Sequence, residues 1–271
     1  MQRRMHCAPL LLIIAVALAP VATFAENDGL DRIVKAGVVK IGVPDNFPPF
    51  GDLGADAKLQ GYDIDIAALV AAGLGVKPEL VAVASTERIS ELTDGKVDLV
   101  ISSLGKSPER QKEIDFSVAY APFYNGVFGP AELPVTSPED LAGRSIAVTR
   151  DTIEDADLTK AAPPGATIKR FDDNGRTEVA FVFNQADLIA TGNVVAAQIL
   201  ATNPARKPLL KFLLHNSPCY IGVAKGQPAL LARVNAIIAG ARQDGSLDKA
   251  SRQWLKAPLD DPEHPAAMVA K

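Results

Sequence analysis

Residues 38–43 read VVKIGV, and residues 61–75 read GYDIDIAALVAAGLG. The first stretch is a β-branched run that stops at Pro44, which is typical of a buried strand. In the second stretch, Asp63 is placed to cap a helix over residues 63–74, and the final glycine is placed to end it. Apolar residues recur along this helix at helical spacing and predict one buried face. These two stretches therefore predict a buried strand followed by an amphipathic helix.

The alternation of strands and helices continues in two series of about 100 residues each. Further strands are predicted at residues 80–83, 97–102, 145–149, 167–171, 186–191, 211–214 and 219–224. Further helices are predicted at residues 86–93, from Ser107 onward, and at 137–141, 174–184, 194–201, 228–243 and 246–255. Extended segments at residues 120–128 and 216–224 join the two series. This organisation predicts an α/β protein of two lobes, linked by two crossover segments, with a ligand cleft between the lobes.

Four loops are expected to carry the chemistry of this cleft. They follow the predicted strands after Val43, Ile101, Val148 and Ala190. Open α/β sheets bind ligands outside the carboxyl ends of their strands, because helix N-termini and loop side chains meet there.

Composition and charge narrow the class of protein. The chain has 271 residues, of which 48% are hydrophobic and 22% charged, so a substantial core is expected and global disorder is excluded. The formal net charge is −4 and no dense block of lysine and arginine occurs. A nucleic-acid partner is therefore not expected, because binding to phosphates requires a basic face.

The N-terminus has the pattern of a secretory signal peptide. Arg3 and Arg4 precede the apolar run Leu10–Ala19, and the segment Ala22–Ala25 places small residues just before Glu26. We predict that residues 1–25 are a cleaved signal peptide and that the protein is periplasmic; an uncleaved N-terminal anchor is the alternative. The proline-rich segment 257–271 is expected to be a loose tail.

Cysteine and histidine usage argues against several kinds of site. Cleavage would leave Cys219 as the one cysteine, which excludes an internal disulfide and a thiolate metal site, and a buried structural thiol is expected. His215 and His264 have no serine, acid or second histidine at a suggestive spacing. We therefore predict no metal site, no cofactor and no catalytic residue.

Four blocks resemble a known family in their order and spacing. They are GYDIDI at residues 61–66, VKIGVPDNFPPF at 39–50, DLVISSLGKSPERQKEIDF at 98–116 and DLAGRSIAVTRDT at 140–152. The chain resembles the bacterial periplasmic solute-binding proteins of the amino-acid type, family 3, which supply ABC importers. The resemblance extends over nearly all of residues 29–256.

The resemblance implies a type II periplasmic-binding-protein fold that closes on its ligand by a hinge. It assigns residues 26–124 and 219–256 to lobe 1 and residues 125–218 to lobe 2. It implies a small-molecule ligand, an amino acid or a related carboxylate, and a membrane permease as partner. A monomer is expected.

Lobe 1 contains most of the predicted ligand contacts. Arg110 follows Ser107 near the start of a predicted helix, where a guanidinium suits a carboxylate, and the resemblance gives it the ligand α-carboxylate. An ion pair with Glu109 or Glu113 is the alternative. The resemblance also implies hydrogen bonds from the segment at Ser102 and Ser103, a backbone contact from Gly105, and a stacking role for Phe47. Asp45 and Asn46 are nearby polar candidates, and Phe50 is expected in the core.

Lobe 2 departs from the family pattern. Thr152 is the conservative ligand-contact candidate, while Arg150 either takes a second carboxylate or faces solvent. Gly192, followed by Asn193, stands where amino-acid binders usually carry an aspartate for the ligand ammonium group. A buried ammonium group needs a counter-charge. Either Asp45, Asp151 or Glu154 supplies it, or the ligand has no α-amino group.

Two other functions remain open from the sequence. Periplasmic cyclohexadienyl dehydratase resembles the same fold, but its activity requires an acid just after the strand that ends at Thr191, and residues 192–195 contain none. A sensory protein that presents its closed form to a membrane receptor is the second alternative.

Overall fold

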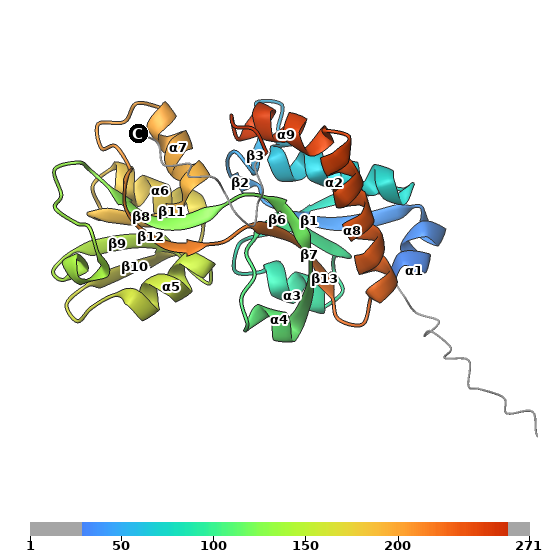
Figure 1. Ribbon diagram of the computed structural model, residues 1–271, viewed down its shortest axis with the longest axis horizontal. Coiled ribbons are helices and arrows are strands. Elements are labelled where there is room, and N and C mark those ends of the chain that lie inside the picture. Colours follow the sequence, from blue (N-terminus) through green and yellow to red (C-terminus); the bar gives the residue numbers. More distant parts are fainter. Residues whose placement is uncertain (1–28, 260–271) are drawn as a thin grey trace, which may run out of the picture.

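The computed structural model describes residues 29–259 and shows two α/β lobes side by side (Figure 1). Helices and strands alternate along the chain, as predicted, because β-branched runs supply the strands and amphipathic runs supply the covering helices. The predicted signal peptide lies outside the described residues. No helix within residues 29–259 combines the length and apolar character that crossing a membrane requires.

The first lobe is built on a mixed five-stranded sheet in the order β5-β1-β6-β13-β7. Strand β1 pairs in parallel with β5 and β6, whereas β13 is antiparallel to β6 and β7. A small antiparallel sheet in the order β2-β3-β4 follows β1. The strands are β1 (Val38–Val43), β2 (Asn46–Phe47), β3 (Gly51–Leu53), β4 (Leu59–Gln60), β5 (Lys77–Ala82), β6 (Leu99–Leu104), β7 (Ile114–Ala121) and β13 (Cys219–Ala224).

The second lobe is built on a sheet in the order β10-β9-β11-β8-β12. Strands β9, β10 and β11 are parallel, and β8 is antiparallel to both β11 and β12. The strands are β8 (Tyr124–Gly129), β9 (Ser145–Thr149), β10 (Thr167–Phe171), β11 (Leu188–Gly192) and β12 (Leu209–Asn216).

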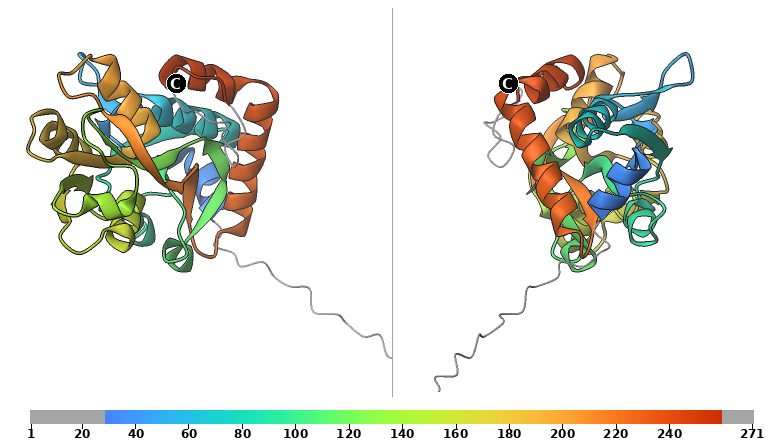
Figure 2. Two further views of the ribbon diagram at one scale, coloured as in Figure 1. Left: turned by 60° about the vertical axis from the view of Figure 1, so that its left-hand side comes forward. Right: turned by 90° about the vertical axis from the view of Figure 1, so that its right-hand side faces the viewer.

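Helices cover both sheets (Figure 2). Those of the first lobe are α1 (Gly29–Ala36), α2 (Tyr62–Leu74), α3 (Arg88–Thr93), α4 (Arg110–Glu113), α8 (Pro228–Gln243) and α9 (Ser246–Trp254). Those of the second lobe are α5 (Ile153–Ala161), α6 (Asn174–Val182), α7 (Asn193–Ala201) and the 3-10 helix η1 (Pro138–Leu141). Helix α2 packs on β1, β5 and β6 and also contacts α8 and α9, so it is central to the first core.

The two crossovers are shorter than the sequence predicts. The chain leaves the first sheet at Ala121 and joins the second at Tyr124, and it returns between Asn216 and Cys219. Most of the predicted extended segments, 120–128 and 216–224, belong to strands, because their backbones pair within the two sheets. Each connection between the two sheets therefore has two residues outside the strands.

Asp63 has a role different from the predicted helix cap. Gly61 is the N-cap residue of α2, and Asp63 lies in the first turn with no exposed surface. Its Oδ1 accepts a hydrogen bond of 2.6 Å from the Tyr120 hydroxyl, and its Oδ2 accepts one of 2.7 Å from the Ser103 amide. The carboxyl group therefore joins α2 to β7 and to the end of β6.

The C-terminal segment is attached further than predicted. The Ser251 hydroxyl donates to the Ala257 carbonyl, and the Leu259 amide donates to Asp248, both at 2.8 Å. The prediction therefore places the start of the loose tail, at Ala257, too early. Residues 260–271 lie outside the described part of the chain. Cys219 is fully buried, as predicted.

The close packing of Gly61 gives a stability prediction. Its φ of 140° and ψ of 177° form a conformation almost restricted to glycine, and a Cβ there would lie 2.3 Å from the Phe50 carbonyl oxygen. We expect Gly61→Ala to lower the free energy of unfolding by about 1–3 kcal/mol or more in urea titrations. Gly240→Ala on α8 is the control, because a Cβ there meets no atom within 4 Å. It should be neutral or stabilising; equal losses in both variants would contradict the assignment.

Candidate functional site

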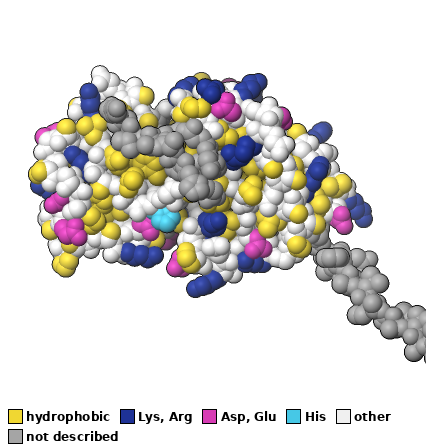
Figure 3. Space-filling view, viewed as in Figure 1, with side chains coloured by type: hydrophobic (Ala, Val, Ile, Leu, Met, Phe, Trp, Pro, Cys, Tyr) yellow, Lys and Arg dark blue, Asp and Glu magenta, His cyan; other side chains and the backbone are white. Residues whose placement is uncertain are grey.

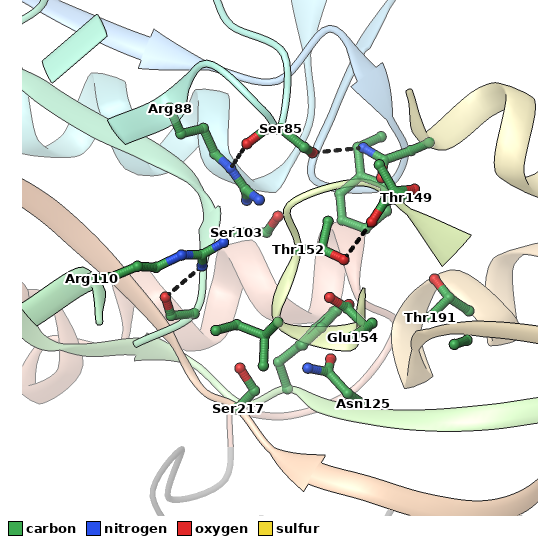
Figure 4. A pocket seen from close by; sticks show the side chains of 16 residues that line it. Ser85, Arg88, Ser103, Arg110, Asn125, Thr149, Thr152, Glu154, Thr191 and Ser217 are labelled. Atoms are coloured by element: carbon green, nitrogen blue, oxygen red, sulfur yellow. Dashed lines mark hydrogen bonds between the residues drawn. The ribbon is translucent and has the colours of Figure 1, made fainter. Parts of the chain in front are cut away.

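A cleft lies between the two lobes (Figure 4). The carboxyl ends of β1, β6, β9 and β11 face it, so the four predicted loops do surround the site. The side chains and backbone groups that line the cleft belong to Phe47, Ser85, Arg88, Ser103, Gly105, Arg110, Phe123, Asn125, Thr149, Thr152, Ile153, Glu154, Asn174, Ala190, Thr191 and Ser217.

Arg110 points into the cleft from the start of α4. Its amide donates to the Ser107 hydroxyl at 3.2 Å, which anchors the backbone of this short helix. Its guanidinium donates to the Gly105 carbonyl at 2.9 Å and, across the cleft, to the Asp151 carbonyl at 2.8 Å. The side chain thus turns away from the alternative partners on its own helix. Burial lowers the pKa of Arg110 to about 10, so the group stays charged at neutral pH.

Arg88 is a second cleft arginine, and the sequence analysis missed it. Only 5% of its surface is exposed. Its guanidinium donates to the Ser85 carbonyl at 3.0 Å and to the Ser102 carbonyl at 2.8 Å. Burial lowers the pKa of Arg88, whereas the negative charge of Glu154 raises it. The available signal was an arginine at the start of a short helix beside a strand end, the same pattern as at Arg110.

The end of β6 is held from two sides. Arg88 binds the carbonyl of Ser102, and Asp63 accepts from the amide of Ser103, whose φ is 42°. Ser103 lines the cleft, but Ser102 is buried and does not, so only one of the two predicted serines is in place. Burial raises the pKa of the Asp63 carboxyl to about 7, against the effects of its two hydrogen bonds and of Arg88.

Gly105 is required by contact between the lobes. A Cβ there would lie 2.6 Å from the Ser217 hydroxyl oxygen and 2.8 Å from Ile153 Cγ1. The residue contributes its backbone to the cleft, as the sequence analysis predicts, and its carbonyl is bound by Arg110. Thr152 also lines the cleft, where it caps α5 by accepting from the Asp155 amide at 3.2 Å.

Two phenylalanines form the apolar side of the cleft. Phe47 lines it and stacks on Phe50, with ring centroids 5.7 Å apart, and Phe50 is fully buried in the core, as predicted. Phe123 packs edge-on against Phe50 at 5.5 Å. A Cβ at Gly192 would lie only 1.7 Å from the Phe123 ring. Phe123 therefore fills the space in which an aspartate at position 192 would start.

Besides Ser102, the structure leaves five further predicted residues outside the cleft. Gly192 is covered by the Phe123 ring, and the Asn193 side chain accepts a hydrogen bond of 3.1 Å from the Tyr124 amide. Both residues therefore contact the first crossover. Arg150 is exposed and pairs with Asp172 at 3.2 Å, which decides between its two predicted orientations in favour of solvent. Asp45 and Asn46 are half-buried outside the cleft, since the chain turns away after β1.

Glu154 is the carboxylate of the cleft. Among the described residues that line it, Glu154 alone carries an acidic side chain, and it enters from the first turn of α5 in the second lobe. Burial raises the pKa of this carboxyl, while the charges of Arg88 and Arg110 and a hydrogen bond with Thr152 lower it. Of the three acids that the sequence analysis considered for a ligand ammonium group, only this one faces the cleft.

Asn125 is the most constrained polar group of the cleft. It lies on β8, between β11 and β12, and its side chain reaches the cleft near Glu154 and Ser217 (Figure 4). Only 1% of its surface is exposed, and neither Nδ2 nor Oδ1 has a hydrogen-bond partner within residues 29–259. Buried amides are rarely left unpaired, so this group is prepared for a partner that enters the cleft.

The family model described as bacterial extracellular solute-binding proteins, family 3, matches residues 39–257. The chain belongs to this family. This match and the two-lobed fold confirm the resemblance seen in the sequence.

Relatives of this family-3 protein cover most of the chain. The L-cystine-binding protein TcyJ of Escherichia coli is 26% identical over 92% of this chain and 95% of its own length. The solved L-cysteine receptor of Neisseria gonorrhoeae is 31% identical with a TM-score of 0.78, over 83% of this chain and 93% of its own. The solved structure of a mutant of ArgBP from T. maritima is 25% identical with a TM-score of 0.77, over 84% of this chain and 99% of its own.

A cyclohexadienyl dehydratase from Pseudomonas aeruginosa is also related, at 25% identity over 61% of this chain and 58% of its own. Most of the named relatives are binding proteins, and the prediction that this family-3 protein is not an enzyme is confirmed. Residues 29–259 contain no cluster of three or more side chains suited to a metal ion.

A second groove of the family-3 protein lies beside the cleft, and the predicted ligand contact Asn46 lines it instead. Glu178 of α6 and Asp52 of β3 face each other there from the two lobes. Glu178 Oε1 is buried without a hydrogen-bond partner among the described residues. Burial, and then the charge of Asp52, raise the pKa of Glu178 to about 7.

This raised pKa predicts how stability depends on pH. The folded-state pKa of Glu178 lies above the ordinary value of 4.5, so protonation favours the folded state, and this stabilisation is lost as pH rises from about 4.5 through about 7. We expect Glu178→Gln to gain about 1–3 kcal/mol relative to the wild type between pH 5 and pH 8 in urea unfolding. Glu132→Gln, at an exposed site, is the control. Parallel pH profiles for Glu178→Gln and wild type would refute the assignment.

Proposed function

We propose that this protein is the periplasmic binding component of an ABC importer and that its ligand is an amino acid. One observation carries the proposal: Arg110 from the first lobe and Glu154 from the second face the same cleft. A cation and an anion on opposite sides suit the carboxylate and the ammonium group of a zwitterion. The closed complex would then be delivered to a membrane permease, and the protein would act as a monomer.

Arg110 is proposed to bind the ligand carboxylate. Its two hydrogen bonds to carbonyls leave further N–H donors free, and neither carbonyl neutralises the positive charge. A partly buried guanidinium without a full counter-charge favours an anion. Ser103, beside it at the end of β6, supplies a hydroxyl group to the same side of the cleft (Figure 4).

Glu154 is proposed to bind the ligand ammonium group. The family position at Gly192 is closed by Phe123, and neither Asp45 nor Asp151 lines the cleft. The acidic partner would therefore have moved from the end of β11 to the start of α5, where Thr152 caps the helix. This change preserves the amino-acid ligand even though residue 192 carries no acid.

Closure would be a rotation of the lobes about the two crossovers. Arg110 donates to the Asp151 carbonyl of the other lobe, and Asn174 donates to Ser85 at 3.4 Å. A ligand that contacts both lobes binds the closed state better than the open one and therefore shifts the population toward closure. Related binding proteins named for L-cystine, arginine and glutamine support a ligand of this class.

Substitution of Arg110 tests the carboxylate contact. The chain from residue 26 is unfolded, freed of bound ligand, refolded and titrated with the standard amino acids by calorimetry. We expect Arg110→Ala to weaken binding of the best amino acid by at least about 100-fold, because a charged hydrogen-bonding partner is lost. Arg110→Lys should recover part of this loss, since it restores the charge but not the planar fork. Unchanged affinity in Arg110→Ala would refute the proposal.

Substitution of Glu154 tests the ammonium contact. We expect Glu154→Gln to weaken binding of the amino acid by about 10- to 100-fold, because a charge-assisted bond becomes a neutral one. The control ligand is the matching 2-hydroxy acid, which lacks the ammonium group, and its affinity should not fall. A wild type that prefers the hydroxy acid over the amino acid would remove the amino-acid assignment.

A further inference from the structure

We infer that Asn125 forms hydrogen bonds with the side chain of the bound amino acid, and that this side chain is polar and uncharged. The inference rests on the proposed function and adds a ligand class to it. It starts from the one buried polar group that faces the cleft without a partner among the described residues that line it.

The backbone fixes the position of Asn125. Strand β8 is paired on both sides, and residue 125 lies opposite Gly192 of β11 and His215 of β12. The side chain is short, and only 1% of the surface of the residue is exposed. The amide therefore cannot turn to solvent, and its donor and acceptor remain in the cleft.

The unpaired Asn125 amide carries an energetic cost in this position. A buried amide without a hydrogen-bond partner is costly, whereas a ligand that pairs with it recovers the cost on binding. An apolar ligand side chain beside Asn125 would displace any solvent and leave both amide atoms unpaired. A ligand hydroxyl, thiol or carboxamide group would pair with at least one of them.

The charges of the site argue against a charged side chain. Glu154 is the sole acid among the described lining residues, and the proposed ammonium contact uses it, so a second cation on the ligand would have no partner. Arg88, the remaining cation, lies in the field of the negative charges of Glu154 and Asp63, which offset its own charge. A zwitterion with a neutral side chain adds no unbalanced charge to this set.

The surroundings of Asn125 fit the same class. Thr191 on β11 and Ser217 on the second crossover add hydroxyl groups to this part of the cleft (Figure 4). Phe47, Phe123 and Ile153 supply the apolar surface that a short aliphatic stem would contact. The site therefore combines one apolar wall with a hydrogen-bonding end.

The test compares ligands that differ only in the polar group. Serine and cysteine are each paired with 2-aminobutyrate, and glutamine is paired with 2-amino-5-methylhexanoate. Dissociation constants are measured for the wild type and for Asn125→Leu, which is close in size. In the wild type we expect the preferred polar ligand to bind about tenfold or more tightly than its apolar counterpart. In Asn125→Leu this preference should disappear, through weaker binding of the polar ligand rather than stronger binding of both.

The same data separate the possible failures. A wild type that prefers arginine, lysine or an aliphatic amino acid overturns the inference but keeps the proposed function. A preference for the polar ligand that survives in Asn125→Leu also overturns the inference and keeps the proposed function. If circular dichroism shows that Asn125→Leu does not fold, Asn125→Ala takes its place. Absence of binding to any amino acid refutes the proposed function itself.

Discussion

The buried carboxyl group of Asp63 is the contact on which the geometry of the site depends. It accepts from the Ser103 amide and from the Tyr120 hydroxyl, so it connects the first turn of α2 with the ends of two strands. Ser103 thereby keeps a left-handed backbone that a serine rarely adopts. Arg88 donates to the carbonyl of the adjacent Ser102, and Arg110 begins α4 seven residues after Ser103. A rigid strand end is needed here because a bidentate contact tolerates little displacement.

The second constraint is the narrow space where the lobes meet. Gly105 leaves room for Ile153 and Ser217, and Gly192 leaves room for the Phe123 ring. Phe123 occupies the space beside β11, and Glu154, the acid that lines the cleft, belongs to α5. On the face shown in Figure 3, side chains of both charges are spread over both lobes.

Local patterns accounted for much of the fold and for part of the site. The order of strands and helices, the buried face of α2 and the loops around the cleft followed from hydrophobic spacing and turn residues. Arg110, Ser103, Gly105, Phe47 and Thr152 reached the cleft because each is placed by a short segment next to a strand end. Arg150, Asp45, Asn46, Ser102 and the pair Gly192–Asn193 did not, since their orientation depends on neighbours distant in the sequence.

The sequence by itself determined that this is an α/β chain of two similar series, with an arginine at a helix start and no acid at residue 192. These features depend on spacings within about ten residues, which backbone geometry converts directly into strands, helices and caps. Only the tertiary structure decided that Asp63 supports Ser103, that Arg88 and Glu154 face the cleft, and that Asn125 stays buried without a partner. The physical reason is that burial and charge pairing across the cleft arise from contacts between segments up to about 100 residues apart, and no local pattern encodes them.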